Sequence, residues 1–334
     1  MDDTVLTWAG WDRTLDIRIV NVRALGPDET VIASVPEMSL SLSVQALLKG
    51  KVAPQTIELF RPKIHFVRNR DQSISVGFAD GSKTDMESLQ DVIDAVGNRL
   101  NSADSISYLS QVSIIDADMT IVDETLGSSW SAPAAQIHLD RIGRNIKGRM
   151  ELGINIDGQH AQIDIEGDYR AEKKRIEIRL SFSEIRPALF SNLSQKVETL
   201  KMVNMPLQGT ITASMLANGT VLSIGFDIDG GSGHVIVPPP LDQYLGVQKF
   251  ELQGRFNGID REINIENLFV DFGEGQTLFL PAPMSHEMPI ASLRATGRYT
   301  AERSRLNLSS LDLDLDGPKI SLTTLVDGIG GETT

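Results

Sequence analysis

The chain has 334 residues, a formal net charge of −14 and no cysteine. Without cysteine it has no disulfide and no thiolate metal site, and its scattered basic residues disfavour nucleic-acid binding, which needs a clustered positive surface. No stretch approaches the roughly 20 apolar residues that span a bilayer as a helix. Aromatic residues make up only 5% of the chain, so much of its apolar content is aliphatic, as is typical of strands.

Short runs in which every second residue is apolar recur along the chain. Because the side chains of a strand point alternately to opposite faces, these runs predict a sheet with one apolar and one polar face. Asn-Gly and Asp-Gly pairs lie between runs and are typical of tight hairpin turns, which favours antiparallel pairing. The clearest runs are residues 15–19, 40–44, 150–156, 175–180 and 311–315, and the turn pairs are residues 157–158, 218–219 and 257–258.

In chain order, the patterns divide the sequence into three parts. Residues 1–80 form a first β segment, residues 84–101 an amphipathic helix, and residues 106–334 a continuing repetitive β region. The fold class that we predict is therefore mainly β, with a long, twisted antiparallel sheet and one or two amphipathic helices.

Helical signals are few. In residues 84–101, Leu89, Val92 and Val96 follow spacings of three and four, and capping-box spacing begins the segment. A shorter helix is predicted at residues 187–200, and a single turn at residues 44–48. So few helices leave much of a large apolar sheet face without a helical cover.

The sequence contains no motif typical of a catalytic or metal site. The five histidines never pair at a helical metal-ligand spacing, and His286 with Glu287 lacks the second histidine of a zincin motif. The chain has no Gly-x-Ser-x-Gly elbow and no P-loop lysine. Carboxylates such as Asp312 and Asp314 alternate with leucine, so a solvated strand face explains them. We therefore expect no enzyme activity, no metal and no cofactor.

The first β segment carries a series of short motifs in a fixed order. These are Ile-x-Ile-x-Asn-Val at residues 17–22, Pro-Glu at residues 36–37, Leu-Leu-x-Gly at residues 47–50 and Ile-Glu-Leu-x-x-Pro-x-Ile at residues 57–64. This order resembles the opening of the AsmA-like superfamily of bacterial envelope proteins, particularly its YhdP-like and TamB-like members.

The later region, from residues 119–123 through residues 182–187, looks like the repetitive part of the YhdP-like branch. Asp71 and Gln72 depart from the family's Asp-Gly pair, which leaves the geometry of that turn open. The family's N-terminal membrane anchor is also missing, so we expect the chain to be an excised part of a longer protein tethered to the inner membrane.

The resemblance implies a fold and a function. Members of the superfamily are similar to bridge-like lipid-transfer proteins, in which a long sheet curls into a taco-like groove with an apolar inner face. By this likeness, the chain is a non-enzymatic lipid-transport module of the Gram-negative periplasm. Its partners would be a phospholipid or another acyl lipid, the inner membrane and an unidentified outer-membrane component.

The residues expected to line the groove are the apolar members of the alternating runs. Their role would be to solvate acyl chains, and the competing role for each is ordinary core. They are Ile17, Ile19, Leu40, Leu42, Ile57, Leu59, Ile64, Phe66, Ile154, Ile156, Ile163, Ile165, Ile176, Ile178, Leu180, Ile263 and Ile265.

Two other interpretations stay open. In one, the apolar faces meet each other in a closed β-sandwich, and the chain is a scaffold or assembly factor for outer-membrane biogenesis with no lipid conduit. In the other, the chain is an extracellular carbohydrate-active β-solenoid enzyme. That reading predicts aromatic platforms, and the low aromatic content disfavours it.

Overall fold

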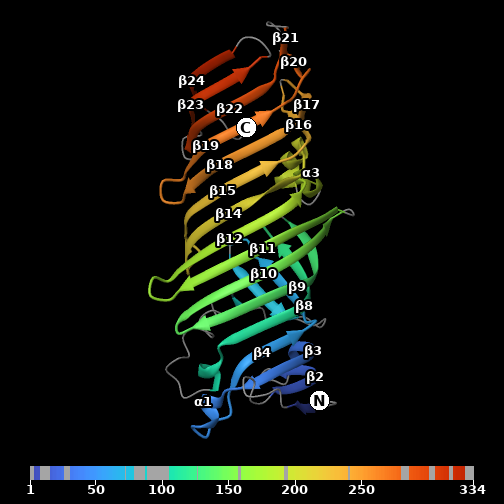
Figure 1. Ribbon diagram of the computed structural model, residues 1–334, viewed down its shortest axis with the longest axis vertical. Coiled ribbons are helices and arrows are strands. Elements are labelled where there is room, and N and C mark those ends of the chain that lie inside the picture. Colours follow the sequence, from blue (N-terminus) through green and yellow to red (C-terminus); the bar gives the residue numbers. More distant parts are fainter. Residues whose placement is uncertain are drawn as a thin grey trace. The chain divides into compact units, whose positions relative to one another are not determined.

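The computed structural model describes residues 4–7, 16–25, 31–71, 73–78, 87–88, 105–125, 127–156, 159–191, 195–239, 241–279, 286–300, 305–315 and 319–327. Strands account for 72% of these residues and helices for 7%, which confirms the predicted mainly-β class. Over these residues the largest sheet is mixed and open rather than closed on itself (Figure 1). The chain divides into two compact units, which we describe separately: Met1–Ile178 with Leu216–Gly219, and Arg179–Met215 with Thr220–Thr334.

The first unit is built almost entirely of strands. Its hairpins β2–β3, β8–β9, β9–β10 and β10–β11 are antiparallel. The elements are β1 (Thr4–Thr7), β2 (Asp16–Leu25), β3 (Val31–Leu42), α1 (Val44–Leu47), β4 (Pro54–Phe60), β5 (Lys63–Arg68), β6 (Ile74–Phe78), β7 (Glu87–Ser88), the 3-10 helix η2 (Ser105–Tyr108), β8 (Gln111–Asp123), β9 (Ser128–Ile142), β10 (Asn145–Ile156), β11 (Gln159–Arg170) and β12 (Arg175–Ile185), which contains the boundary between the units.

The pairing of β4 and β5 differs from the antiparallel pattern that we predicted. Both strands run parallel to β8, β4 along its first part and β5 along its second part. Parallel neighbours need a long crossover connection, and the segment from β6 to η2 supplies it. The sheet is therefore mixed at this point.

Irregular backbone positions follow one line across the sheet of the first unit. Asn21 in β2, Arg61 between β4 and β5, Asp116 in β8 and Ala134 in β9 all have positive φ, between 53° and 57°. In the pairing order β2–β3–β4–β8–β9, Arg61, Asp116 and Ala134 lie on successive strands, and β3 lies between Asn21 and Arg61. The pairing of β8 with β9 shifts register near Asp116 and Ala134, as at β-bulges, which bend a strand and increase its twist. The sheet folds over along this line, which we call the crease.

Hydrogen bonds continue through the crease. The amide of Arg61 donates to the carbonyl of Ile115 at 2.8 Å, and the amide of Asp118 donates to the carbonyl of Pro62 at 2.9 Å. The backbone therefore changes direction between β4 and β5 without leaving these polar groups unpaired.

The second unit combines a long antiparallel meander with two small sheets. The meander runs in the order β14, β15, β18, β19, β22, β23, β24, and the small sheets are β13–β16–β17 and β20–β21. Its elements are α3 (Pro187–Phe190), the 3-10 helix η4 (Gln195–Met202), β13 (Val203–Asn204), β14 (Leu207–Leu216), β15 (Val221–Gly230), β16 (Gly233–Val237), β17 (Gln243–Val247), β18 (Lys249–Asn257), β19 (Glu262–Asp271), β20 (Thr277–Phe279), β21 (Glu287–Pro289), β22 (Ser292–Thr300), β23 (Arg305–Asp314) and β24 (Lys319–Asp327).

The predicted helices have different outcomes. The single turn at residues 44–48 is confirmed as α1, which Ser43 caps by accepting a hydrogen bond from the amide of Ala46 at 3.3 Å. The helix at residues 187–200 is found as two short pieces, α3 and η4. Of the helix at residues 84–101, the described part is β7, a two-residue strand paired with β6, and the remainder lies outside the described residues.

Candidate lipid-binding faces

One apolar side chain from each of seven neighbouring strands forms a continuous row in the first unit. At about 4.8 Å between strands, the row extends over roughly 30 Å, which is comparable to the hydrocarbon thickness of a bilayer. We call it the central row. From β2 through β3, β4, β8, β9 and β10 to β11, its members are Ile19, Met38, Leu59, Ile114, Ile137, Met150 and Ile165.

The positions next to the central row form a polar row on the opposite face. Its side chains bond to one another across strands, as in the contact of Ser113 Oγ with His138 Nδ1 at 2.9 Å and the ion pair of Arg149 with Glu166 at 4.0 Å. From β2 to β11 its members are Arg18, Ser39, Glu58, Ser113, His138, Arg149 and Glu166. The two faces of this sheet are thus chemically distinct.

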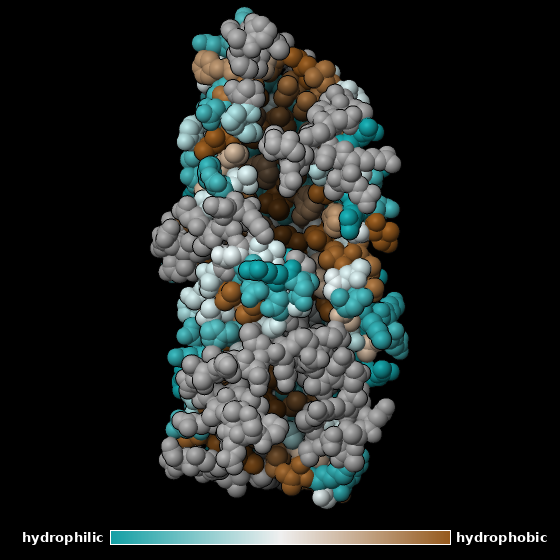
Figure 2. Space-filling model, turned by 180° about the vertical axis from the view of Figure 1, so that it is seen from behind, coloured by the Kyte–Doolittle hydropathy of each residue, from teal (hydrophilic) through white to brown (hydrophobic). Residues whose placement is uncertain are grey.

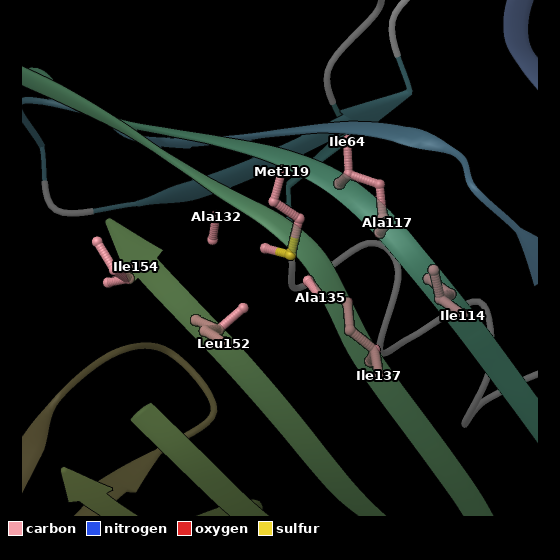
Figure 3. Close-up of a cluster of buried hydrophobic side chains, with 9 residues drawn as sticks. All are labelled: Ile64, Ile114, Ala117, Met119, Ala132, Ala135, Ile137, Leu152 and Ile154. Carbon is pink, nitrogen blue, oxygen red and sulfur yellow. The ribbon is translucent and has the colours of Figure 1, made fainter. Parts of the chain in front are cut away.

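Part of the apolar face is a packed core beside the crease. Ile64 and Met119 are each only 1% exposed, and they come from β5 and β8, beyond the crease from Ile114 and Ile137. Figure 3 shows their side chains gathered in one cluster with Leu152 and other neighbours. The sheet covers its own apolar face where it folds over.

The second unit has apolar rows of the same kind. The polar face opposite them carries Glu251, whose pKa is lowered by a hydrogen bond from Lys249, and Arg294, whose guanidinium lies 4.9 Å from the ring centre of Phe269. Two of the apolar rows are formed by half-buried side chains and glycines, and we call them the half-buried rows. They are Ile211, Phe226, Gly254, Ile265, Gly297 and Leu308, and beside them Ala213, Ile224, Phe256, Ile263, Tyr299 and Leu306.

A third apolar row of the second unit is covered by other side chains of the same unit. Phe250, Val270 and Leu293 pack against Met205 and Leu245, which the small sheet and the segment before β14 supply. This end of the face is therefore core, whereas the half-buried rows lie outside that cluster. Figure 2 shows a hollow in this unit with hydrophobic atoms on its floor.

The structure divides the predicted groove residues into classes by their surroundings. Ile64 and Ile154 are buried core, with Leu59, Phe66, Ile163 and Ile165 packed against them, and Leu42 is also buried. The side chain of Ile156 lies outside the described residues. The other nine are half-buried, and they are Ile17, Ile19, Leu40, Ile57, Ile176, Ile178, Leu180, Ile263 and Ile265.

Sequence reasoning missed several members of the rows. Ile114 and Ile137 lie on strands where bulges interrupt the alternation, so the pattern there is broken in sequence. Phe226 and Phe256 follow a regular alternation along β15 and β18, and extending the same count to those runs would have found them.

Other kinds of site are not evident in the described part of the chain. Among those residues, no group of three or more histidine, aspartate or glutamate side chains is placed to hold a metal ion. No helix within the described ranges is long and apolar enough to cross a bilayer.

Comparison with known proteins adds no relative: no family model, no curated protein and no solved structure matches the chain. The chemistry of the two faces is therefore what indicates a function. Rows of aliphatic and aromatic side chains can solvate hydrocarbon at about 0.8 kcal/mol for each methylene that they bury.

Proposed function

We propose that the chain is a non-enzymatic lipid-binding module whose half-buried apolar rows solvate the acyl chains of phospholipid or another envelope lipid. The observation that carries the proposal is the continuity of these rows across strands in register, with polar side chains on the opposite face. A surface of this kind holds hydrocarbon without selecting a particular chain, because the side chains of these rows are apolar apart from the hydroxyl of Tyr299.

Transport follows from the same geometry. Many weak and similar apolar sites in a row allow a chain to move from one site to the next, because no single site binds it much more tightly than its neighbour. Together with the resemblance to AsmA-like proteins, this geometry supports our proposal that the module lies in the Gram-negative periplasm and carries lipid between the inner and outer membranes.

The closed-sandwich alternative has one observation in its favour. The small sheets of the second unit cover the row of Phe250, Val270 and Leu293, as a scaffold with no conduit would require for the whole face. A test must therefore examine the half-buried rows and not the covered row.

Site-specific photocrosslinking tests the proposal. A photoreactive amino acid replaces Ile263 in one variant and Asn264 in another, because these neighbours on β19 lie in rows on opposite faces. We expect a radiolabelled phospholipid to crosslink at Ile263 and not at Asn264. Equal labelling at the two positions, or none at either, would contradict a lipid-binding face.

A further inference from the structure

The loop that follows β3 exposes apolar side chains at one end of the first unit. Leu48 is 84% exposed and Val52 is 69% exposed, and Val44 and Leu47 are also exposed. We call residues 44–52 the apolar tip. Single exposed apolar residues are common, but four within nine residues form a patch that needs a partner.

The backbone of the apolar tip is already hydrogen-bonded. Successive amides donate to carbonyls within the tip, as Leu48 does to Val44 and Lys51 does to Ala46, each at 2.9 Å. The side chain of Ala46 is fully buried and anchors the turn. The tip can therefore enter an apolar medium without leaving these backbone groups unpaired.

The charge of the apolar tip differs from that of the chain. Lys49 and Lys51 lie between Leu48 and Val52, and residues 43–53 contain no acidic residue, although the chain as a whole carries −14. A patch that is locally basic and apolar complements the surface of an anionic bilayer, where lysine side chains reach phosphates while their neighbours enter the acyl region.

A second exposed apolar residue is linked to the same end of the unit. Lys49 Nζ lies 5.7 Å from the ring centre of Tyr108 in η2, and Arg141 Nη2 donates to the carbonyl of Ser107 in η2 at 2.5 Å. Ile142, next to Arg141 at the turn between β9 and β10, is 61% exposed. The 3-10 helix η2 thus connects the apolar tip to the turn between β9 and β10, where Ile142 exposes a further aliphatic side chain.

We propose that the apolar tip, together with Ile142, docks the first unit on the surface of an anionic phospholipid bilayer. This inference is independent of the half-buried rows, because it concerns attachment to a membrane and not the solvation of single lipid molecules.

Co-sedimentation of the full chain with vesicles tests the docking. One set of vesicles contains phosphatidylglycerol with phosphatidylcholine, and the other contains phosphatidylcholine alone. We expect the unchanged chain to bind the anionic vesicles, with an affinity that weakens as salt is added. The double variant Leu48→Gln with Val52→Gln should lose about tenfold or more in affinity. In the double variant Lys49→Gln with Lys51→Gln, each lysine removed should lower the affinity about fivefold.

A matched control lies elsewhere on the chain. Ile259, in the turn between β18 and β19 of the second unit, is 79% exposed, so Ile259→Gln removes a similar aliphatic side chain that is not part of the tip. This variant should sediment as the unchanged chain does.

Three results would overturn the proposal. In the first, the unchanged chain does not sediment with anionic vesicles. In the second, the tip variants bind these vesicles as well as the unchanged chain does. In the third, Ile259→Gln loses as much vesicle binding as the tip variants do. Size-exclusion chromatography of the same proteins tests whether the tip instead binds a second copy of the chain. In that case the unchanged chain would be a dimer that does not bind vesicles, and the tip variants would be monomers.

Discussion

At the scale of single residues, the crease is the least expected feature of the first unit. Left-handed backbone costs an L-residue other than glycine roughly 1–2 kcal/mol, yet Arg61, Asp116 and Ala134 adopt it side by side. Such positions persist where the surrounding sheet determines them. Here the hydrogen-bonded pairing of β4 and β5 with β8, on either side of the bend, holds the backbone in this conformation.

Ala134→Gly should stabilise the chain. Glycine adopts positive φ without the steric cost, so we expect a gain of about 0.5–1 kcal/mol in the free energy of unfolding, measured with urea. The control is Ala213→Gly in β14, which is not among the positive-φ residues and should lose about as much. Equal losses for both substitutions would show that the bend at Ala134 is not as described.

Burial separates two isoleucines that the sequence pattern treats alike. Ile64→Ala should cost about 2–5 kcal/mol, because its side chain is only 1% exposed within the crease cluster. Ile263→Ala, in a half-buried row, should cost about half as much or less. Denaturant unfolding of both variants checks this, and equal costs would mean that Ile263 is core and unavailable to a ligand.

At the scale of elements, close contact between strands depends on glycine. A Cβ atom added at Gly254 in β18 would lie 2.4 Å from the carbonyl oxygen of Asn264 and 2.6 Å from Phe226 Cζ. The ring of Phe226 thus occupies the space above the glycine, which keeps the half-buried row continuous across β15 and β18.

Gly254→Ala should therefore destabilise the second unit by about 1–3 kcal/mol. The control is Gly153→Ala in β10, where an added Cβ meets no atom within 4 Å and the substitution should be neutral or slightly stabilising. Thermal unfolding followed by circular dichroism distinguishes them. If both variants unfold at the same temperature, β15 and β18 are not packed as closely as described.

Much of the strand content was predictable from local pattern, because alternation such as that at residues 150–156 and 175–180 reflects the geometry of each strand. Three features were not predictable in this way. The bulges at Asp116 and Ala134 change which face a residue occupies, and the parallel pairing of β4 and β5 with β8 depends on a distant crossover. Alternation also cannot distinguish Ile64, in a packed core, from Ile263, in a half-buried row.

At the scale of the whole molecule, both units present apolar rows on one face and charged rows on the other. Their packing differs, since the crease cluster covers part of the face in the first unit and the small sheets cover part of it in the second. The half-buried rows, which neither cluster contains, are therefore the part of the chain that distinguishes a lipid-binding module from a scaffold.

Native mass spectrometry of the full chain, purified without detergent and offered an isotope-labelled phospholipid, tests this claim most directly. We compare the unchanged chain with Ile263→Asp and with the control Asn264→Asp, which lies on the polar face, after circular dichroism has shown all three to be folded. The account predicts a lipid adduct on the unchanged chain and on the control, and none on Ile263→Asp, because an unpaired charge repels hydrocarbon. A lipid-free mass for the unchanged chain, or an adduct that Ile263→Asp retains, would contradict it.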